Sequence, residues 1–284
     1  MSEPVMIAGR GDGVKIQLAQ WGQNGKAVLC IHGITANCRC WDVVASSLEK
    51  GVRVLAMDLR GRGRSDKPAS GYSVDQHCRD IVALLDDLGL KRPVIMGHSL
   101  GAFIALAFAA NYPERVESAI LVDGGGDLSA EQMAKVFSGI KPALERLGKV
   151  FPSADAYIDL MKQAPYLQPW SPALEAYCRY ELTEVEGGVK ANIDPLHIQE
   201  EAINLGKMKA ASLYGKINGK VLILRATEGL LAADDILLPE PVVEGMIQEI
   251  PNAQRVDIQG TNHYGILFRP SPLRDEAIRS FLQG

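Results

Sequence analysis

The chain has 284 residues, of which 47% are hydrophobic and 23% charged, a composition typical of a folded globular protein. Its net charge of −4 gives no reason to expect nucleic acid or an anionic membrane as a partner, and its length allows a capped single domain or two domains. The N-terminal residues lack the apolar run of a secretory signal and no stretch approaches the roughly 20 apolar residues of a membrane span, so we expect a cytoplasmic protein.

The cysteines give no sign of a disulfide framework or a metal site. There are five of them, an odd number at uneven spacing, in a chain that begins without a signal-like segment. Cys38 and Cys40 are separated by one residue, but no second Cys or His pair at metal-binding spacing follows them. We therefore expect reduced thiols and no metal.

The N-terminal part predicts strands that alternate with loops and a helix. Apolar and polar residues alternate over 14–18, which predicts a half-buried strand at a sheet edge. An apolar strand follows at 27–31 and leads directly into the segment 32–35, which reads His-Gly-Ile-Thr. The pattern over 43–48 then predicts a helix that packs on the sheet, and 52–57 predicts the next buried strand.

A loop rich in glycine and arginine follows the strand at 52–57. It reads Asp58-Leu59-Arg60-Gly61-Arg62-Gly63-Arg64-Ser65-Asp66, and its three arginines suggest a phosphate site. A P-loop would end in Gly-Lys-Ser/Thr, however, and a dinucleotide-binding turn would read G-x-G-x-x-G before a helix. Neither pattern is present, so we interpret this loop as structural.

A serine lies at the turn between a buried strand and an apolar helix. After a packing helix at 73–89, the short strand at 94–96 runs into Gly97-His98-Ser99-Leu100-Gly101 and then into a helix-forming segment. G-x-S-x-G alone is a weak signal, but the strand–turn–helix context predicts a nucleophile elbow. Such a turn lifts Ser99 Oγ above the sheet edge, and it leaves the backbone N–H of Leu100 free to stabilise an oxyanion at the helix N-terminus.

A long insertion separates the next two predicted strands. The strand at 119–122 ends in an Asp-Gly-Gly-Gly-Asp segment at 123–127, and the following strand, 221–225, begins only about 95 residues later. One crossover needs only about 30 residues. The excess is compatible with helix, is interrupted by prolines and is rich in aromatic residues, one or two of which we expect to face a pocket. The pattern therefore predicts a helical insertion at 128–215.

The C-terminal part completes the alternation of strands and helices. We predict a helix at 243–250 and a last strand at 255–258, followed by a loop that contains Asn262 and His263. Ser271-Pro272 then opens a C-terminal helix, with Ser as N-cap and Pro at the first helical position.

Four segments together resemble the α/β-hydrolase-fold superfamily, and within it the capped serine esterases and related hydrolases. They are His32-Gly33, the loop at 58–65, the elbow at Ser99 and Asn262-His263, so the resemblance runs nearly from end to end. It implies a mostly parallel, twisted sheet flanked by helices, with a core formed by 1–127 and 216–284. It also implies that the insertion at 128–215 is a helical cap over the active site, and that the backbone N–H of Ile34 is the second oxyanion donor.

The predicted nucleophile needs a base, and His263 fits that role best. It lies in the loop between the last strand and the last helix, and the order Ser…acid…His requires a histidine late in the chain. His98 adjoins the nucleophile, so we expect its side chain to point away. The other three histidines lie in the oxyanion loop, where we expect an ordering role, on a helix surface and in the insertion: His32, His77 and His197.

The acid of the predicted triad is less clearly marked. In most relatives it follows the strand before the histidine strand, as Gly-x-x-Asp, but here that segment is Ala226-Thr227-Glu228-Gly229, with Gly where the Asp would fall. Some relatives take the acid from the end of the strand that precedes the cap, where this chain has Asp123. We predict Asp123 as the acid and retain Glu228, Asp234 and Asp235 as alternatives.

These residues predict a hydrolase that works through an acyl-enzyme on a carboxylic ester, lactone or thioester of a small to medium apolar substrate. Ser99, His263 and Asp123 would form the catalytic triad, with Ile34 and Leu100 as oxyanion donors. No metal or organic cofactor is implied, the expected partner is a small-molecule substrate, and a homodimer is left open.

Several alternatives share the same residues. Carbon–carbon bond hydrolases and cofactor-free perhydrolases or haloperoxidase-like enzymes also keep the elbow serine, and a non-catalytic ligand receptor could retain the whole triad. Epoxide hydrolases and haloalkane dehalogenases use a carboxylate at the elbow, so Ser99 argues against both.

Overall fold

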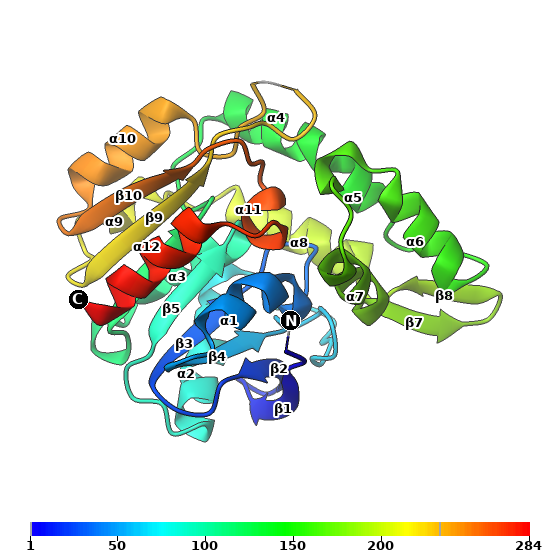
Figure 1. Ribbon diagram of the computed structural model, residues 1–284, viewed down its shortest axis with the longest axis horizontal. Helices are drawn as coiled ribbons and strands as arrows, with labels where there is room; N and C mark the ends of the chain where they lie inside the picture. Colours follow the sequence, from blue (N-terminus) through cyan, green and yellow to red (C-terminus); the bar gives the residue numbers. More distant parts are fainter. Residues whose placement is uncertain (1, 233) are drawn as a thin grey trace.

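The computed structural model describes residues 2–232 and 234–284. Within these ranges an 8-stranded sheet has the order β1-β2-β4-β3-β5-β6-β9-β10. β2 pairs antiparallel with β1 and β4, and the other neighbours pair parallel. The mostly parallel, twisted sheet predicted from the sequence is therefore confirmed (Figure 1).

The strands of this sheet were predicted from the sequence with one exception. They span Val5–Arg10 (β1), Lys15–Trp21 (β2), Lys26–Ile31 (β3), Val52–Met57 (β4), Val94–His98 (β5), Ser118–Val122 (β6), Lys220–Ala226 (β9) and Ala253–Ile258 (β10). The sequence did not predict β1, so the strand expected at the sheet edge, β2, is the second one. β1 is mostly exposed, and an exposed edge strand lacks the regular apolar alternation of a half-buried one.

Helices cover both faces of the sheet (Figure 1). They span Asp42–Leu48 (α1), Val74–Asp87 (α2), Leu100–Asn111 (α3), Ala211–Tyr214 (α9), Glu240–Glu249 (α10), Gly265–Phe268 (α11) and Pro272–Gln283 (α12). Successive residues of a strand point to opposite faces, and in β3 both faces are buried. Leu29 and Ile31 pack in the core beneath α2 and α3, whereas Val28 and Cys30 pack in the core beneath α1 and α12.

The insertion at 128–215 is not entirely helical. Its helices are Ala130–Gly139 (α4), Lys141–Glu145 (α5), Ala154–Lys162 (α6), Pro172–Tyr180 (α7) and Pro195–Leu205 (α8), followed by α9. The segment predicted as a helical insertion also contains the strands Leu182–Val185 (β7) and Gly188–Ala191 (β8), which pair antiparallel. Gly187 and Gly188 have φ of 86° and 141°, and this backbone, which glycine adopts without strain, closes the hairpin between the two strands.

Most of the insertion lies to one side of the sheet, with β7 and β8 farthest from it (Figure 1). α9 is different because it packs against α3 and α10, which belong to the layered core. The segment predicted to end at residue 215 thus includes one short helix that packs with the core.

Three 3-10 helices complete the elements in the described ranges: Cys38–Trp41 (η1), Pro113–Arg115 (η2) and Pro165–Leu167 (η3).

Buried and partly buried polar contacts join the insertion to the loop at 58–66. Tyr180 Oη donates to Asp58 Oδ2 at 2.7 Å, and Asn192 Nδ2 donates to Gly63 O at 2.9 Å. Glu201 of α8 bonds both Arg62 Nη2, at 3.0 Å, and His77 Nε2, at 2.7 Å. His77, which we expected on an exposed helix surface, is fully buried because the insertion covers that side of α2.

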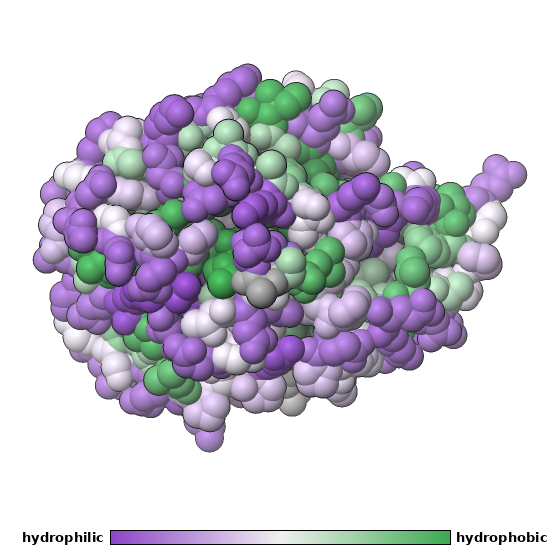
Figure 2. Space-filling view, turned by 90° about the horizontal axis from the view of Figure 1, so that it is seen from above, coloured by the Kyte–Doolittle hydropathy of each residue, from purple (hydrophilic) through white to green (hydrophobic). Residues whose placement is uncertain are grey.

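On the face seen in Figure 2, hydrophilic residues predominate and hydrophobic residues form small separate groups. No helix in the described ranges has both the length and the apolar character that crossing a membrane would require.

The Glu201 cluster generates a prediction about the pH dependence of stability. Burial by itself raises the pKa of Glu201, but His77 and Arg62 outweigh it and lower the pKa to about 2, against an ordinary value of 4.5. An acid with a lowered folded-state pKa stabilises the fold above its unfolded pKa, and this stabilisation is lost as the pH falls toward the folded one. We expect Glu201→Gln to cost about 3–5 kcal/mol of unfolding free energy near pH 7.

The difference between wild type and Glu201→Gln should shrink between about pH 5 and pH 2, as measured by urea unfolding. The matched control is Glu200→Gln on the same helix, because Glu200 accepts the amides of Gly71 and Tyr72, both at 3.0 Å, and forms no ion pair with any residue that the structure describes. A difference between wild type and Glu201→Gln that stays constant with pH would contradict the assignment.

Candidate active site

Ser99 lies at the turn between β5 and α3, at the carboxyl end of the parallel strands. Its backbone has φ 56° and ψ −120°, a conformation that L-residues rarely adopt. The turn is held on both sides, because Ser99 N donates to Val122 O at 3.1 Å and Ala102 N donates to Ser99 O at 2.9 Å. The side chain of Ser99 is therefore presented from a rigid, strained position.

The two glycines of the turn are required by close backbone contacts. A Cβ on Gly97 would lie 1.9 Å from the carbonyl oxygen of Gly101. A Cβ on Gly101 would lie 2.1 Å from the carbonyl oxygen of Ile31 in β3. Only residues without a Cβ allow α3 to cross this close to β3 and β5.

His263 lies in the loop after β10, and the structure brings it together with Asp123. His263 Nδ1 is 2.7 Å from Asp123 Oδ2, and both side chains are buried. Asp123 Oδ1 accepts the amide of Ala226 at 3.0 Å, so both carboxylate oxygens have a donor. When the Nδ1–H of His263 donates to the carboxylate of Asp123, Nε2 carries no proton and is free to accept one. The structure records no hydrogen bond between Ser99 Oγ and His263 Nε2, although both residues line one cavity.

The other three candidate acids do not contact His263. Glu228 is exposed, and Asp234 is exposed and pairs with Lys135 Nζ at 3.0 Å. Asp235 is buried, but its oxygens accept amides of its own loop, those of Leu230, Leu231 and Ala232.

The conformation of the loop after β9 explains why no Asp lies at the usual position of the acid. Gly229 occupies that place, and a Cβ there would lie 1.8 Å from Ala232 O and 2.2 Å from Asp235 Oδ1. The loop folds tightly over this glycine and cannot accommodate a carboxylate side chain there.

The loop that carries Ile34 is fixed by His32. Leu59 N donates to His32 Nε2 at 3.0 Å, so Nδ1 carries the proton and donates to Gly33 O at 2.7 Å. Burial lowers the pKa of His32 to about 3, which keeps the ring neutral. Gly33 O and Ile34 N belong to one planar peptide, so His32 also fixes the direction of the Ile34 N–H. Within residues 2–232 and 234–284, neither Ile34 N nor Leu100 N donates to a protein acceptor.

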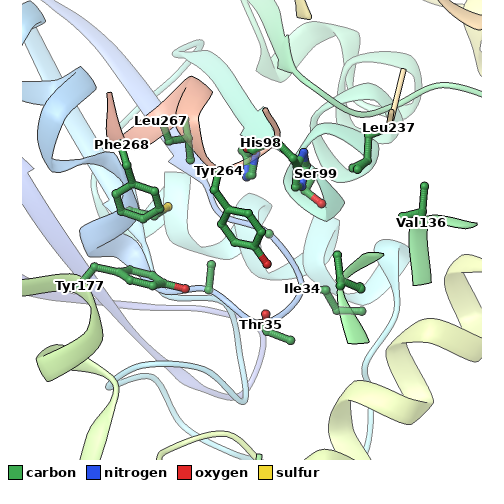
Figure 3. Close-up of a pocket in the computed structure, with 15 residues that line it drawn as sticks. Ile34, Thr35, His98, Ser99, Val136, Tyr177, Leu237, Tyr264, Leu267 and Phe268 are labelled. Atoms are coloured by element: carbon green, nitrogen blue, oxygen red, sulfur yellow. The ribbon is translucent and has the colours of Figure 1, made fainter. Parts of the chain in front are cut away.

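His98 has a neighbour that the sequence did not indicate. Its ring stacks on that of His263, with ring centroids 4.3 Å apart, and lines the same cavity as Ser99 (Figure 3). His98 Nε2 donates to the carbonyl oxygen of His263 at 2.9 Å. Burial and the nearby His263 hold the pKa of His98 well below its ordinary value, so the ring is neutral. The loop of His263 packs over the end of β5, which is why the two rings meet.

Two cavities meet at Ser99. His263 lines the first cavity. Tyr177, Tyr264 and Thr35 bring hydroxyl groups to it, and both tyrosine hydroxyls point toward Thr35 (Figure 3). Tyr177 is thus one of the insertion's aromatic residues that face a pocket. Thr35 and Tyr264 were not singled out in the sequence, although each directly adjoins a predicted site residue.

The second cavity lies on the side of Leu100. Apart from Ser99 and two glycines, every residue that lines it is apolar. Both cavities are lined by Ile34, Ser99, Val136, Ile140 and Leu237. Among the described residues, no group of three or more His, Cys, Asp or Glu side chains has an arrangement suited to a metal ion.

Comparison with known proteins adds to this geometry. A family model described as alpha/beta hydrolase fold matches residues 26–180. An uncharacterized protein of Mycobacterium tuberculosis is 43% identical over 103 residues, which make up 36% of this chain and only 30% of that relative. The 2-(acetamidomethylene)succinate hydrolase of Mesorhizobium japonicum is 26% identical over 85% of this chain and 82% of its own.

The fold is also shared with solved structures. The crystal structure of E-2-(acetamidomethylene)succinate hydrolase matches with a TM-score of 0.83 at 24% identity, and the match covers 99% of this chain and 100% of that one. This likeness extends over the whole sheet and the insertion.

The contacts at the turn generate a prediction about glycine substitutions. We expect Gly101→Ala to destabilise the protein by several kcal/mol, about 3 or more, because its Cβ would meet backbone that cannot move independently. Gly245 of α10 is the matched control, since a Cβ there meets nothing within 4 Å. Gly245→Ala should stabilise the protein by about 0.4–1 kcal/mol. Urea unfolding of both variants measures the difference, and equal stabilities would refute the close crossing.

Proposed function

The chain belongs to the α/β-hydrolase family, and on that premise we propose that it is a serine hydrolase that cleaves a carboxylic ester, lactone or thioester through an acyl-enzyme. One observation carries this proposal: the 2.7 Å contact between His263 Nδ1 and Asp123 Oδ2, beside a cavity that Ser99 and His263 both line. A buried carboxylate on Nδ1 leaves Nε2 as the base, which is the arrangement that an elbow serine requires.

In the proposed reaction, Ser99 Oγ attacks the carbonyl carbon and gives its proton to His263 Nε2. Asp123 holds the tautomer of His263 and stabilises the imidazolium that forms. The amides of Ile34 and Leu100 donate to the oxyanion of the tetrahedral intermediate. His263 then protonates the leaving group and activates a water molecule, which hydrolyses the acyl-enzyme and releases the acid.

The two cavities suggest where each half of the substrate lies. The leaving group must reach His263 to be protonated, and His263 lines only the first cavity. The acyl group stays bonded to Ser99, so it would occupy the second, apolar cavity on the side of Leu100. We therefore propose an apolar acyl group of small to medium size, and a leaving group with a polar atom that the hydroxyls of Thr35, Tyr177 and Tyr264 can bind.

Covalent labelling tests the nucleophile and the acid together. With a fluorophosphonate probe and an intact-mass readout, we expect one adduct on the wild type and none on Ser99→Ala. Asp123→Asn should slow labelling by about 10²–10⁴-fold, because the imidazole loses its fixed tautomer. Glu228→Gln is the matched control, and it should label at the wild-type rate.

Two results would reject this assignment: a folded wild type that fails to label, or an Asp123→Asn variant that labels as fast as the wild type. Turnover of p-nitrophenyl butyrate well beyond one equivalent separates an enzyme from a ligand receptor that keeps the triad. A single equivalent of p-nitrophenol would favour the receptor.

The acyl cavity generates a prediction about chain length. Phe137 lines only the second cavity, so Phe137→Ala should enlarge the acyl site. In a series of p-nitrophenyl esters, we expect the optimum to move to longer acyl chains, with each additional methylene contributing about 0.8 kcal/mol, or about fourfold in kcat/KM. A series that varies the alcohol at constant acyl group serves as the control. If the variant changes alcohol preference instead, the two cavities have been assigned the wrong way round.

A further inference from the structure

Three consecutive carbonyl groups of the oxyanion loop are held by buried cationic or imidazole side chains. His32 Nδ1 donates to Gly33 O, as described above. Arg62 Nε donates to the carbonyl oxygen of Ile34 at 3.1 Å, and Arg146 Nη2 donates to that of Thr35 at 3.2 Å. Both arginines are buried, at 0% and 4% exposure. The proposed reaction assigns no role to these two guanidinium groups.

Arg62 connects the loop to helix α8 of the insertion. Its Nη2 donates to Glu201 Oε2 at 3.0 Å, and its Nη1 donates to the carbonyl of Arg60 at 3.0 Å. Glu201 is fully buried and also contacts His77, so it is fixed from two sides. One rigid guanidinium thus bridges a carboxylate of the insertion and the carbonyl of Ile34.

Arg146 makes an equivalent bridge from the other side. It follows α5, and its Nη2 also donates to Glu181 Oε2 at 2.7 Å. Its Nε donates to Tyr157 Oη at 2.7 Å, and Tyr157 in turn hydrogen-bonds Glu181. Glu181 is 1% exposed, and attraction from this carboxylate outweighs burial to raise the pKa of Arg146 well above its ordinary value.

Buried ion pairs add little net stability to a loop, because the cost of desolvating the two charges offsets most of their attraction. Here two of them hold adjacent carbonyls, and both carboxylates come from the insertion. Peptide groups are planar, so fixing the carbonyls of Gly33 and Ile34 fixes the two peptide planes on either side of the Ile34 Cα. The Ile34 N–H lies in the first of those planes, and the second plane, joined to it at the Cα, restricts how far the first can rotate.

We propose that Arg62–Glu201 and Arg146–Glu181 are positioning pairs through which the insertion sets the direction of the Ile34 amide toward the oxyanion. This inference rests on the proposed function, because it assigns a purpose to the oxyanion donor of that reaction. None of the four residues lines the two cavities at Ser99, so they act on the transition state through Ile34. Their loss should lower kcat and leave KM nearly unchanged.

The test compares three arginine-to-lysine variants. A lysine at 62 or 146 keeps the charge beside its glutamate, but a single ammonium cannot span the carboxylate and the loop carbonyl. We expect Arg62→Lys and Arg146→Lys to lower kcat for p-nitrophenyl butyrate by about 10–100-fold, a substantial part of what loss of one oxyanion donor costs. The affinity for an alkyl trifluoromethyl ketone, which forms the tetrahedral oxyanion, should fall by the same factor as kcat/KM.

Arg60→Lys is the matched control. Arg60 is also buried in the loop at 58–66 and is paired with Asp80 at 2.6 Å, but its remaining hydrogen bonds go to the carbonyls of Gly71 and Asp12. This variant should lose stability without losing kcat. Urea unfolding of all three variants separates the two effects.

Equal kcat losses in Arg60→Lys and Arg62→Lys would overturn the proposal, as would wild-type kcat in both Arg62→Lys and Arg146→Lys. If one of these two variants does not fold, the other still tests the proposal, because the two ion pairs share no residue. Glu181→Gln provides a further test of the Arg146–Glu181 pair. A wild type that neither turns over the ester nor labels with fluorophosphonate would instead reject the proposed function itself.

Discussion

The close crossing of α3 over β3 and β5 is the constraint on which the site depends. Gly97 and Gly101 bring the start of α3 so near the Ile31 carbonyl that the residue between them must adopt a strained backbone. The neighbouring loops also approach without side chains, since a Cβ on Gly33 would lie 3.2 Å from Ser99 Cβ and one on Gly124 2.6 Å from Ser99 O. The strain at Ser99 persists because backbone on every side determines it.

Asp123 shares this pattern of strain. Among the described residues, Ser99 and Asp123 are the two non-glycine residues with positive φ, and they follow the neighbouring strands β5 and β6. The φ of 46° at Asp123 turns its carboxylate toward His263 and the amide of Ala226. The tight loop around Gly229, stabilised by Asp235, removes the usual alternative position. The backbone after β6 therefore places a carboxylate beside His263, and the tight loop after β9 leaves no room for one at the usual position.

The insertion is attached to the loops beside the site by hydrogen bonds and ion pairs. Glu201 and Tyr180 connect the insertion to the loop at 58–66, and Arg146, which is paired with Glu181, connects it to the oxyanion loop. Buried polar networks of this kind contribute little net stability, but they specify one arrangement, since each unpaired member would cost several kcal/mol, about 3–5 for a charge. The arginines of the loop at 58–66 first suggested phosphate binding. In the structure, this loop instead forms the contacts that hold the insertion.

The sequence by itself determined what depends on neighbours along the chain: the buried strands, the strand–turn–helix at Ser99, the late histidine and the presence of an insertion after β6. Apolar periodicity and turn residues encode these features locally. It left open which carboxylate meets His263, and it missed β1, the β7–β8 hairpin, the burial of His77 and the stacking of His98 on His263. The tertiary structure decided the acid and the surroundings of His77 and His98, because their partners lie far along the chain; Asp123 and His263, for example, are 140 positions apart. The β1–β2 and β7–β8 pairings are local, but β1 is mostly exposed and β7 and β8 have only 4 residues each, so none of these strands shows a clear apolar alternation. Local sequence patterns do not predict contacts between distant residues, because these contacts form only when the layers of the fold pack together.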